Sequence, residues 1–289
     1  MARRRRPWEP WLYVLPGLLV FAIFIAYPIL ANIVGSLVGT HGELSLANYR
    51  QAASDAVFWT AVRNSGIWVV ACVLAEGAIG FTLALAIELY VPIGKVAFRT
   101  LLFLPMVVTP SVIALVFSTI YAPGYGLLFG LFDYFGLAGS FPAILGDPST
   151  ATLGVIAVNV WQWCGFFVLM YCVGLAQIDR ELLAAAAIDG AAGLARVRYV
   201  IWPLLWPTTT SLVVLGTIEA LQQFPLIFLM TEGGPADSTQ TLATYIFQTA
   251  FVLNETHYAS AVAVVLFVLA LVLIVLQYRL GRAEQAAHA

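Results

Sequence analysis

The sequence predicts an all-α membrane protein with six transmembrane helices. Of its 289 residues, 62% are hydrophobic and 10% are charged, whereas soluble domains carry about 25% charged residues. The mean hydropathy is +0.93. The apolar segments are long and lack the alternating pattern of about ten residues that marks a strand of a membrane barrel, so helices are the expected form.

Six apolar segments lie between charged or turn-rich breaks, and each is long enough for a span, which needs about 20 helical residues. The first segment follows Arg3–Arg6 and exceeds the roughly 7–15 apolar residues of a signal peptide, so we expect a retained helix. No low-complexity linker divides the chain, so 1–289 is expected to form a single transmembrane domain. The predicted helices cover about 11–38, 63–88, 99–121, 150–176, 203–229 and 257–279.

The lysines and arginines are distributed asymmetrically between the two sides of the predicted membrane. Arg50 and Arg63 fall on one side, and the other eleven of the 13 fall on the opposite side. The positive-inside rule therefore places both termini, the 88–98 turn and the 177–202 loop in the cytoplasm, in a multi-pass protein of the cell membrane. The eleven are Arg3, Arg4, Arg5, Arg6, Lys95, Arg99, Arg180, Arg196, Arg198, Arg279 and Arg282.

The sequence contains no recognisable catalytic, nucleotide-binding or metal-binding motif. There is no GxxxxGK[ST] phosphate loop, and no Ser/His/Asp or Cys/His arrangement suggests covalent catalysis. Cys72, Cys164 and Cys172 lie in apolar segments without a CxxC pair, so we interpret them as packing residues. The chain is predicted to be non-catalytic and to bind no cofactor or metal, and any ATP must be hydrolysed by a separate subunit.

Two acidic residues, Glu76 and Glu219, fall inside predicted spans. A charged side chain at the bilayer centre costs at least about 2.5–3.5 kcal/mol, so such residues face a polar interior or a partner. Glu219 shares a helix face with Gln222 and Gln223, and a carboxylate with two amides suits the hydroxyl groups of a sugar. These acids either line a substrate pathway or are hydrogen-bonded between helices, and the sequence leaves both open.

The fourth predicted span adds Asn159, Trp161, Gln162 and Trp163 as candidate pathway residues. An indole ring can stack on the apolar face of a sugar. Aromatic anchoring at the membrane interface is the alternative for the two tryptophans.

A less hydrophobic stretch, ELLAAAAIDGAAGLARVRYVIWPLLWP, separates the fourth and fifth spans. Its alanines and leucines favour a short helix, which Asp189-Gly190 then ends before a second short helix begins. Such a helix pair could be a structural hairpin or a docking element that fits a groove on a partner. Composition alone supports both.

This stretch resembles the conserved cytoplasmic loop, the EAA loop, of permease subunits in binding-protein-dependent ABC importers of the carbohydrate-uptake branch, the maltose-type inner-membrane permeases. Ala184 stands where that family usually has glutamate, so a polar contact at the ATPase interface is missing at this position. The matching positions are Glu181-Leu182, Ala185-Ala186, Ile188-Asp189-Gly190-Ala191, Val200 and Pro203.

Further matching pieces extend the resemblance over nearly the whole chain. They occur in the family's order, in the first outer loop, at the entry and outer end of helix three, in helix four, and in the last outer loop. The pieces are Ser45–Tyr49 with Phe58-Trp59 and Asn64, Phe98–Thr100 with Phe103–Pro105, Tyr121–Leu127, Trp161–Trp163 through Gly174-Leu175, and Glu232–Pro235 through Thr241-Leu242.

The resemblance implies a type I ABC importer permease-like fold with a short cytoplasmic coupling helix between helices 4 and 5. It implies a non-catalytic subunit that forms the pathway for a mono- or oligosaccharide delivered by an extracytoplasmic binding protein. A second homologous permease and two ATPase subunits, which bind ATP and Mg, would complete the complex. The residues implied in ATPase coupling are Glu181, Ala185, Ala186, Ile188, Asp189, Gly190 and Ala191.

Two other functions remain open at the level of the sequence. The substrate could be a polyol or a glycerol phosphodiester, although no lysine or arginine lies within a predicted span to bind phosphate. A proton-coupled secondary transporter would use Glu76 or Glu219 as a proton relay.

Overall fold

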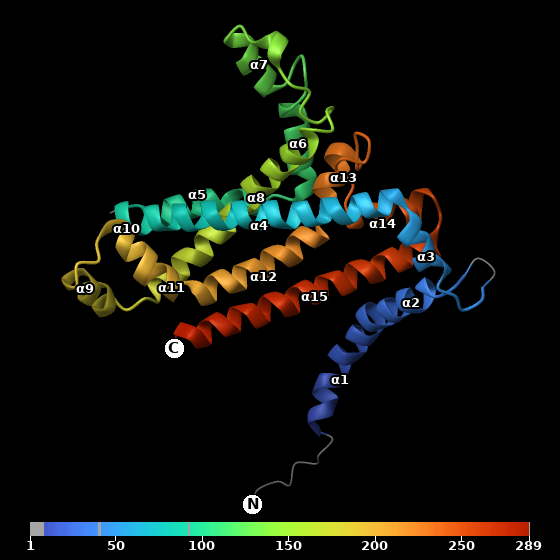
Figure 1. The fold of residues 1–289 in the computed structure, drawn as a ribbon, viewed down its shortest axis with the longest axis horizontal. Coiled ribbons are helices and arrows are strands. Elements are labelled where there is room, and N and C mark those ends of the chain that lie inside the picture. The colour runs from blue at the N-terminus through green and yellow to red at the C-terminus, as the bar shows by residue number, and fades with distance from the viewer. Residues whose placement is uncertain (1–8, 40–41, 92, 289) are drawn as a thin grey trace, which may run out of the picture. The chain divides into compact units, whose positions relative to one another are not determined.

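The computed structural model describes residues 9–39, 42–91 and 93–288, and the elements assigned there are helical (Figure 1). The chain forms two compact units. The first unit contains the described residues of 1–55 together with 246–267, and the second contains those of 56–245 together with 268–289. The single transmembrane domain covering 1–289 stays a prediction.

The helices follow one another along the chain with short connections. They are α1 Glu9–Phe21, π-helix η1 Ala22–Ala26, α2 Tyr27–Ser36, α3 Ala47–Ser54, α4 Ala56–Tyr90, α5 Lys95–Val107, α6 Pro110–Ile120, α7 Leu127–Tyr134, 3₁₀-helix η2 Ala138–Ser140, α8 Ala151–Ala176, α9 Arg180–Ile188, α10 Gly193–Arg196, π-helix η3 Val197–Ile201, α11 Trp202–Leu204, α12 Trp206–Gln222, α13 Pro225–Thr231, α14 Leu242–Phe247, π-helix η4 Gln248–Val252 and α15 Thr256–His288.

Among the described residues, four stretches are long and apolar enough to cross a membrane as continuous spans, and counting each bent helix pair as one span gives up to six. The continuous spans are Tyr13–Ser36, Ala56–Tyr90, Ala151–Ala176 and Thr256–Gly281, which correspond to the predicted first, second, fourth and sixth helices. The predicted third helix is bent by 94° between α5 and α6. The predicted fifth helix, 203–229, is not continuous: Gly193–Leu204 and Trp206–Gln222 form a pair bent by 67°, and α13 begins at Pro225 after a break at 223–224. The second helix of each bent pair, α6 or α12, has proline at one of its first two positions. Proline has no N–H group to donate to the preceding helix, so the helical hydrogen bonds are interrupted there.

The second unit is built around α8, which packs against α4 and α5, while α12 packs against α4. Small residues allow these close approaches, as is common between membrane helices. A Cβ atom at Gly165 of α8 would lie 1.8 Å from the backbone oxygen of Leu102 in α5. A Cβ atom at Gly80 of α4 would lie 2.5 Å from Cβ of Phe167 in α8. The two glycines therefore fix the positions of α4, α5 and α8 relative to one another.

Residues 231–241, which are the last residue of α13 and the loop that leads to α14, are bound to the N-terminal part of α4 by side-chain hydrogen bonds. The Nδ2 of Asn64 donates to the backbone oxygens of Asp237 (3.0 Å), Ser238 (3.1 Å) and Gln240 (2.9 Å). Thr152 Oγ1 of α8 donates to the Ser238 oxygen at 2.7 Å. We call residues 231–241 the anchored loop.

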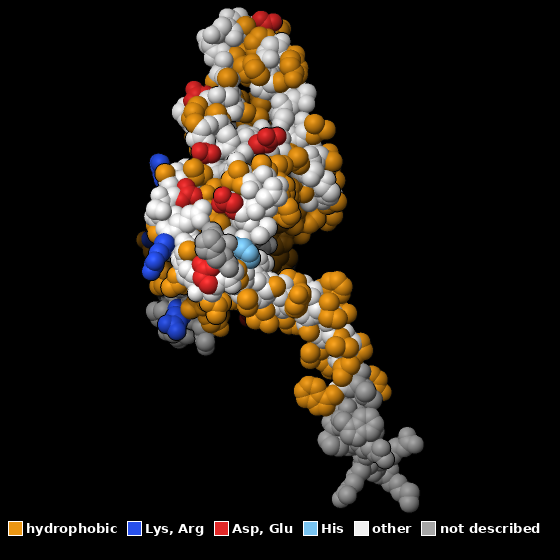
Figure 2. Space-filling view, turned by 90° about the vertical axis from the view of Figure 1, so that its right-hand side faces the viewer, with side chains coloured by type: hydrophobic (Ala, Val, Ile, Leu, Met, Phe, Trp, Pro, Cys, Tyr) orange, Lys and Arg blue, Asp and Glu red, His pale blue; other side chains and the backbone are white. Residues whose placement is uncertain are grey.

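The first unit joins α2 to the start of α15. Ser260 Oγ donates to Asn32 Oδ1 at 3.1 Å, and the ring of His257 contacts the Gly35 oxygen at 3.2 Å. The helix formed by α1, η1 and α2 exposes large apolar side chains such as Leu18 and Phe24. Figure 2 shows the helix that leads to the grey N-terminal residues covered mainly by hydrophobic side chains. Such a surface is stable only in an apolar environment.

Candidate functional site: a polar cluster between three helices

Four polar side chains from α4, α8 and the end of α12 form one hydrogen-bonded cluster. Asn159 in α8 donates through Nδ2 to Glu76 Oε1 in α4, at 3.1 Å. Gln223 donates through Nε2 both to Asn159 Oδ1 at 2.7 Å and to Glu219 Oε1 at 2.9 Å. Glu219 and Gln223 are four residues apart and so lie on one helix face. The two carboxyl groups are thus connected through two amides.

The cluster is buried, and hydrogen bonds within the protein do not satisfy it completely. Glu76 is 1% exposed, and Asn159 is fully buried. The second carboxyl oxygen of each acid, Oε2 of Glu76 and of Glu219, is buried without a hydrogen-bond partner. A buried polar atom without a partner costs about 1–3 kcal/mol. These atoms are therefore candidates for contact with a bound ligand.

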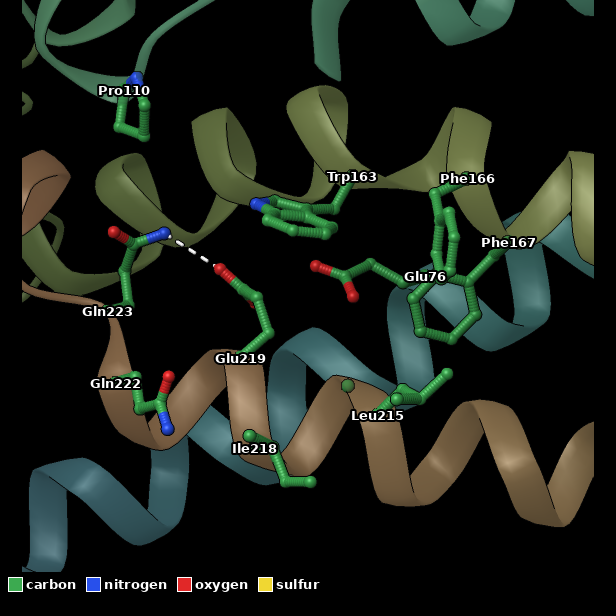
Figure 3. A pocket seen from close by; sticks show the side chains of 11 residues that line it. Glu76, Pro110, Trp163, Phe166, Phe167, Leu215, Ile218, Glu219, Gln222 and Gln223 are labelled. Atoms are coloured by element: carbon green, nitrogen blue, oxygen red, sulfur yellow. Dashed lines mark hydrogen bonds between the residues drawn. The ribbon is translucent and has the colours of Figure 1, made fainter. Parts of the chain in front are cut away.

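Both acids open onto a cavity of about 390 Å³, within the range of small-molecule sites, about 300–1,000 Å³. Figure 3 shows Glu76 and Glu219 entering it from α4 and α12, with the Trp163 ring from α8 beside both carboxyl groups. Phe166 and Phe167 add further aromatic surface from α8. The cavity is lined by Glu76, Pro110, Trp163, Phe166, Phe167, Leu215, Gly216, Ile218, Glu219, Gln222 and Gln223.

Glycine at position 216 lets α12 approach the other helices closely at the cavity wall. A Cβ atom there would lie 3.0 Å from Cζ of Phe167 and 3.3 Å from Cγ2 of Val73. Contacts of that length require the neighbouring side chains to move. Gly216 therefore helps to set the width of the cavity one turn before Glu219.

The break between α5 and α6 is stabilised by a side chain of α8. Gln162 is buried, and its Nε2 donates to the backbone oxygen of Val108 at 3.0 Å. Val108 lies between the two helices, just before Thr109 and Pro110. Carbonyl groups at the end of a helix have no partner within it, so the Val108 oxygen needs a donor from elsewhere. Gln162 thereby positions Pro110, which lines the cavity.

The structure brings together most of the predicted pathway residues, in different roles. Glu76, Trp163, Glu219, Gln222 and Gln223 line the cavity. Asn159 and Gln162 lie behind the lining and hold it in place.

Trp161 is not among the side chains that line the cavity. It is 46% exposed and packs on Phe117 of α6, with ring centroids 5.1 Å apart. Trp161 thus has an aromatic packing contact instead of a place at this site.

The apolar lining residues, above all Phe166, Phe167 and Gly216, were not among the predicted pathway residues. Phe166 lies three residues after Trp163, so it follows Trp163 on the same helix face. That spacing is the signal that could have identified Phe166. Gly216 carried no comparable signal, since its importance depends on a neighbouring helix.

A second candidate site is the segment 177–192, which connects α8 to α10. Asp179 Oδ1 accepts a hydrogen bond from the Glu181 backbone N–H at 2.9 Å and caps the start of α9. The helix ends as predicted at Asp189-Gly190. The N–H groups of Gly190 and Ala191 donate to the oxygens of Ala187 and Ala186, which is the Schellman arrangement.

Gly190 has φ +85°, a left-handed conformation that glycine adopts without strain. Before this turn, α9 exposes apolar side chains to its surroundings. Ile188 is 87% exposed, and Leu182 is also exposed. Leu183, in contrast, packs against the buried cluster that includes Ala84 and Ile87 of α4. One side of α9 is thus attached to the bundle, and the other is open.

Comparison with known proteins identifies the family. The profile of the family described as "Binding-protein-dependent transport system inner membrane component" matches residues 78–284, which include the segment 177–192 and the cavity residues other than Glu76. The chain belongs to this family. It is therefore a membrane component of a binding-protein-dependent transport system, and the predicted family is confirmed.

Individual relatives cover almost the whole chain. "Probable ABC transporter permease protein YurN" of Bacillus subtilis is 33% identical over 285 residues, which cover 95% of this chain and 97% of that protein. "Lactose transport system permease protein LacF" of Rhizobium radiobacter is 31% identical and covers 94% of this chain and 93% of its own. These matches agree with the order of motifs found in the sequence.

A solved structure confirms the fold. One chain in the crystal structure of a bacterial ABC transporter involved in the import of the acidic polysaccharide alginate matches with a TM-score of 0.86. It is 21% identical and covers 96% of both chains. The predicted all-helical, type I permease-like fold is therefore correct.

Proposed function

We propose that this chain forms part of the translocation pathway of an ATP-driven importer for a saccharide. The observation that carries the proposal is the 390 Å³ cavity, which holds two carboxyl groups and aromatic surface inside an apolar helical bundle. Carboxylates accept hydrogen bonds from hydroxyl groups, and amides both accept and donate them. Aromatic rings stack on the apolar faces of sugar rings. The relatives named for lactose transport and alginate import handle saccharides, which supports the same substrate class.

The complex we propose contains a second homologous permease, two ATPase subunits and an extracytoplasmic binding protein. ATP and Mg²⁺ bind to the ATPases, and this chain catalyses no bond chemistry. In line with the distribution of lysine and arginine, both termini and the 177–192 segment lie in the cytoplasm, and the anchored loop lies outside. The exposed face of α9, with Glu181, Ala185 and Ile188, docks on an ATPase subunit.

Transport in this scheme is a shift between inward-open and outward-open states. ATP favours the state in which the two ATPases are closed, because it binds that state more tightly. The segment 177–192 transmits the ATPase movement to α8 and α10, which lie at its two ends. The cavity side chains then exchange their contacts with substrate for contacts with one another.

The test is uptake of a radiolabelled saccharide into proteoliposomes that contain the full complex, the binding protein and internal ATP. We expect Glu219→Ala to lower uptake by about tenfold or more while the complex still assembles, because the substrate loses one or two hydrogen bonds to a charged group. Glu255→Ala is the matched control, because Glu255 is exposed and lies outside the cavity. Normal uptake by Glu219→Ala would remove the pathway role. Uptake that persists without ATP and collapses with the proton gradient would identify a secondary transporter instead.

A further inference from the structure

The two acids of the candidate cavity each keep one carboxyl oxygen free for a ligand. One oxygen of each acid is occupied by an amide, from Asn159 or Gln223. The other oxygen, Oε2 of Glu76 and of Glu219, has no partner and is buried. The indole N–H of Trp163 in the same lining is also buried without a partner. An ionised carboxylate only accepts hydrogen bonds, so a ligand that satisfies both acids in their ionised form brings donors to both.

The ionisable side chains that line the cavity are all acidic. Its eleven lining residues include two glutamates and no lysine, arginine or histidine. The hydrogen bonds to the two glutamates come from neutral amides, which bring no positive charge. Burial and a neighbouring acid oppose the ionisation of a carboxyl group, whereas a cation between the two acids favours it. An ammonium group therefore stabilises both acids in their ionised form, and a carboxylate or phosphate does not.

Aromatic side chains of the cavity favour the same kind of ligand. Trp163 lies beside both carboxyl groups (Figure 3), with Phe166 and Phe167 on the same helix. The faces of aromatic rings attract organic cations, and tryptophan attracts them most strongly. An ammonium group between Glu76 and Glu219 would contact two carboxylates and the Trp163 ring together.

We propose that this cavity takes saccharides that carry a protonated amine, and that it discriminates against saccharides that carry a carboxylate or phosphate. The inference rests on the proposed saccharide transport and narrows its substrate class. The ammonium group donates to Oε2 of Glu76 and of Glu219, and the sugar ring lies against Trp163 and Phe166.

A metal ion fits the same space less well. Calcium takes about 6–8 oxygen ligands, and magnesium requires near-octahedral coordination. The described residues contain no group of three or more histidine, cysteine, aspartate or glutamate side chains placed to hold a metal ion. An ammonium group needs only the acceptors that the cavity leaves free.

The test is equilibrium binding of labelled D-glucosamine, N-acetyl-D-glucosamine and D-glucuronate to the purified full complex in nanodiscs, with EDTA present and no binding protein. These sugars share a ring of similar size and differ in charge. We expect glucosamine to bind at least about tenfold more tightly than N-acetylglucosamine, because it gains one charge-assisted hydrogen bond. We expect glucuronate to bind least tightly of the three. Equal affinities for the amine and the N-acetylated sugar would overturn the inference.

Isosteric variants separate charge from shape. Glu219→Gln is the primary variant, because Glu219 is only partly buried and the amide retains an oxygen that can accept from Gln223. It should bring the ratio of the two affinities close to one, and Glu76→Gln should act in the same direction. Glu255→Gln, exposed and outside the cavity, should leave the ratio unchanged. A preference for glucosamine that survives in both cavity variants would also overturn the inference.

The outcomes distinguish this inference from the function on which it rests. If the complex transports a saccharide in proteoliposomes but binds amine and neutral sugars equally, only the charge preference fails. If glucosamine binding requires added Ca²⁺ and disappears in EDTA, the acids hold a metal and the inference fails. If no saccharide is transported at all, the proposed function fails first.

Discussion

The anchored loop and the segment 177–192 connect helices of the same unit, yet they are stabilised in opposite ways. The anchored loop attaches near Asn64 in the first part of α4, and the segment attaches through Leu183 near Ala84 and Ile87 in the last part. Figure 1 shows α13 and α9 toward different ends of α4. Thr239, Gln240 and Thr241 of the loop are buried, whereas most of α9 is exposed.

The difference shows which of the two regions can keep its conformation without a partner protein. The oxygens of Asp237, Ser238 and Gln240 receive hydrogen bonds from a buried side chain of α4, so the loop needs no other protein to hold its conformation. The described side chains of α9 instead expose Ile188 and Leu182 to their surroundings. An exposed apolar face of this kind is typical of a contact with another protein or with a membrane, and we propose the ATPase subunit as its partner. We therefore expect variants of the loop to change stability, and variants of the segment to change coupling.

The largest effect should come from Gly190→Pro. Proline removes the N–H that donates to Ala187 and cannot adopt φ +85°, so the turn after α9 must change at a cost of about 3 kcal/mol or more. We expect stimulation of ATPase activity by the binding protein to be lost in the reconstituted complex. Gly190→Asn is the matched control, because asparagine tolerates this conformation. Unchanged stimulation in Gly190→Pro would mean that the segment is only a structural connection.

Ile188→Asp should weaken assembly with the ATPase subunits while leaving this chain folded. The side chain is 87% exposed, so its replacement should change the stability of the isolated chain by less than about 0.5 kcal/mol. Placing a charge in a buried contact should reduce co-purification of the ATPase by about tenfold. Ile93→Asp is the control, because Ile93 is 86% exposed and lies in the turn before α5, outside the segment. Equal losses in both variants would contradict a specific docking face.

Asn64→Ala should loosen the anchored loop without disturbing the segment. It removes three hydrogen bonds from one buried amide and leaves carbonyl groups unsatisfied, at a cost of about 1–3 kcal/mol. Hydrogen exchange of the Thr239 and Gln240 amides should accelerate by about tenfold to a hundredfold. Amides of α9 serve as the internal reference and should be unaffected. Acceleration in α9 of the same size would mean that the two regions are not independent.

The smallest effect should come from Thr152→Val, which removes one hydrogen bond to the same loop. The hydroxyl group donates to the Ser238 oxygen at 2.7 Å, and valine keeps its size. A single bond of this kind contributes about 1 kcal/mol. Exchange in the anchored loop should therefore accelerate less than in Asn64→Ala, and the reverse order would show that Asn64 is not the main anchor.

Sequence patterns located the spans because hydropathy depends on the residues of each segment alone. They placed the start of the second helix at Arg63, whereas α4 begins seven residues earlier, at Ala56. Arg63 is exposed at the side of the helix, and arginine favours helix formation, so a charged residue did not end it. The prolines near the breaks were recognised, but the 94° bend between α5 and α6 depends on packing against α8.

The candidate site was predictable only within single helices. The spacing of Glu219 and Gln223 identified a shared face, and the structure joins these two side chains by a hydrogen bond. The pairing of Asn159 with Glu76 required knowledge of how α8 packs on α4, which no local pattern contains. For the same reason the sequence could not separate Trp163, which lines the cavity, from Trp161, which packs on Phe117.

Asn159 has a consequence for the mechanics of the bundle. Its amide binds α4 through the Glu76 carboxyl group and α12 through Gln223, so one side chain of α8 measures the separation of two other helices. Sliding α12 along α4 by the rise of one residue, about 1.5 Å, would stretch one of these bonds beyond hydrogen-bond length. Such a movement therefore leaves a buried amide or carboxyl group without its partner until another group replaces it, at a cost of about 1–3 kcal/mol.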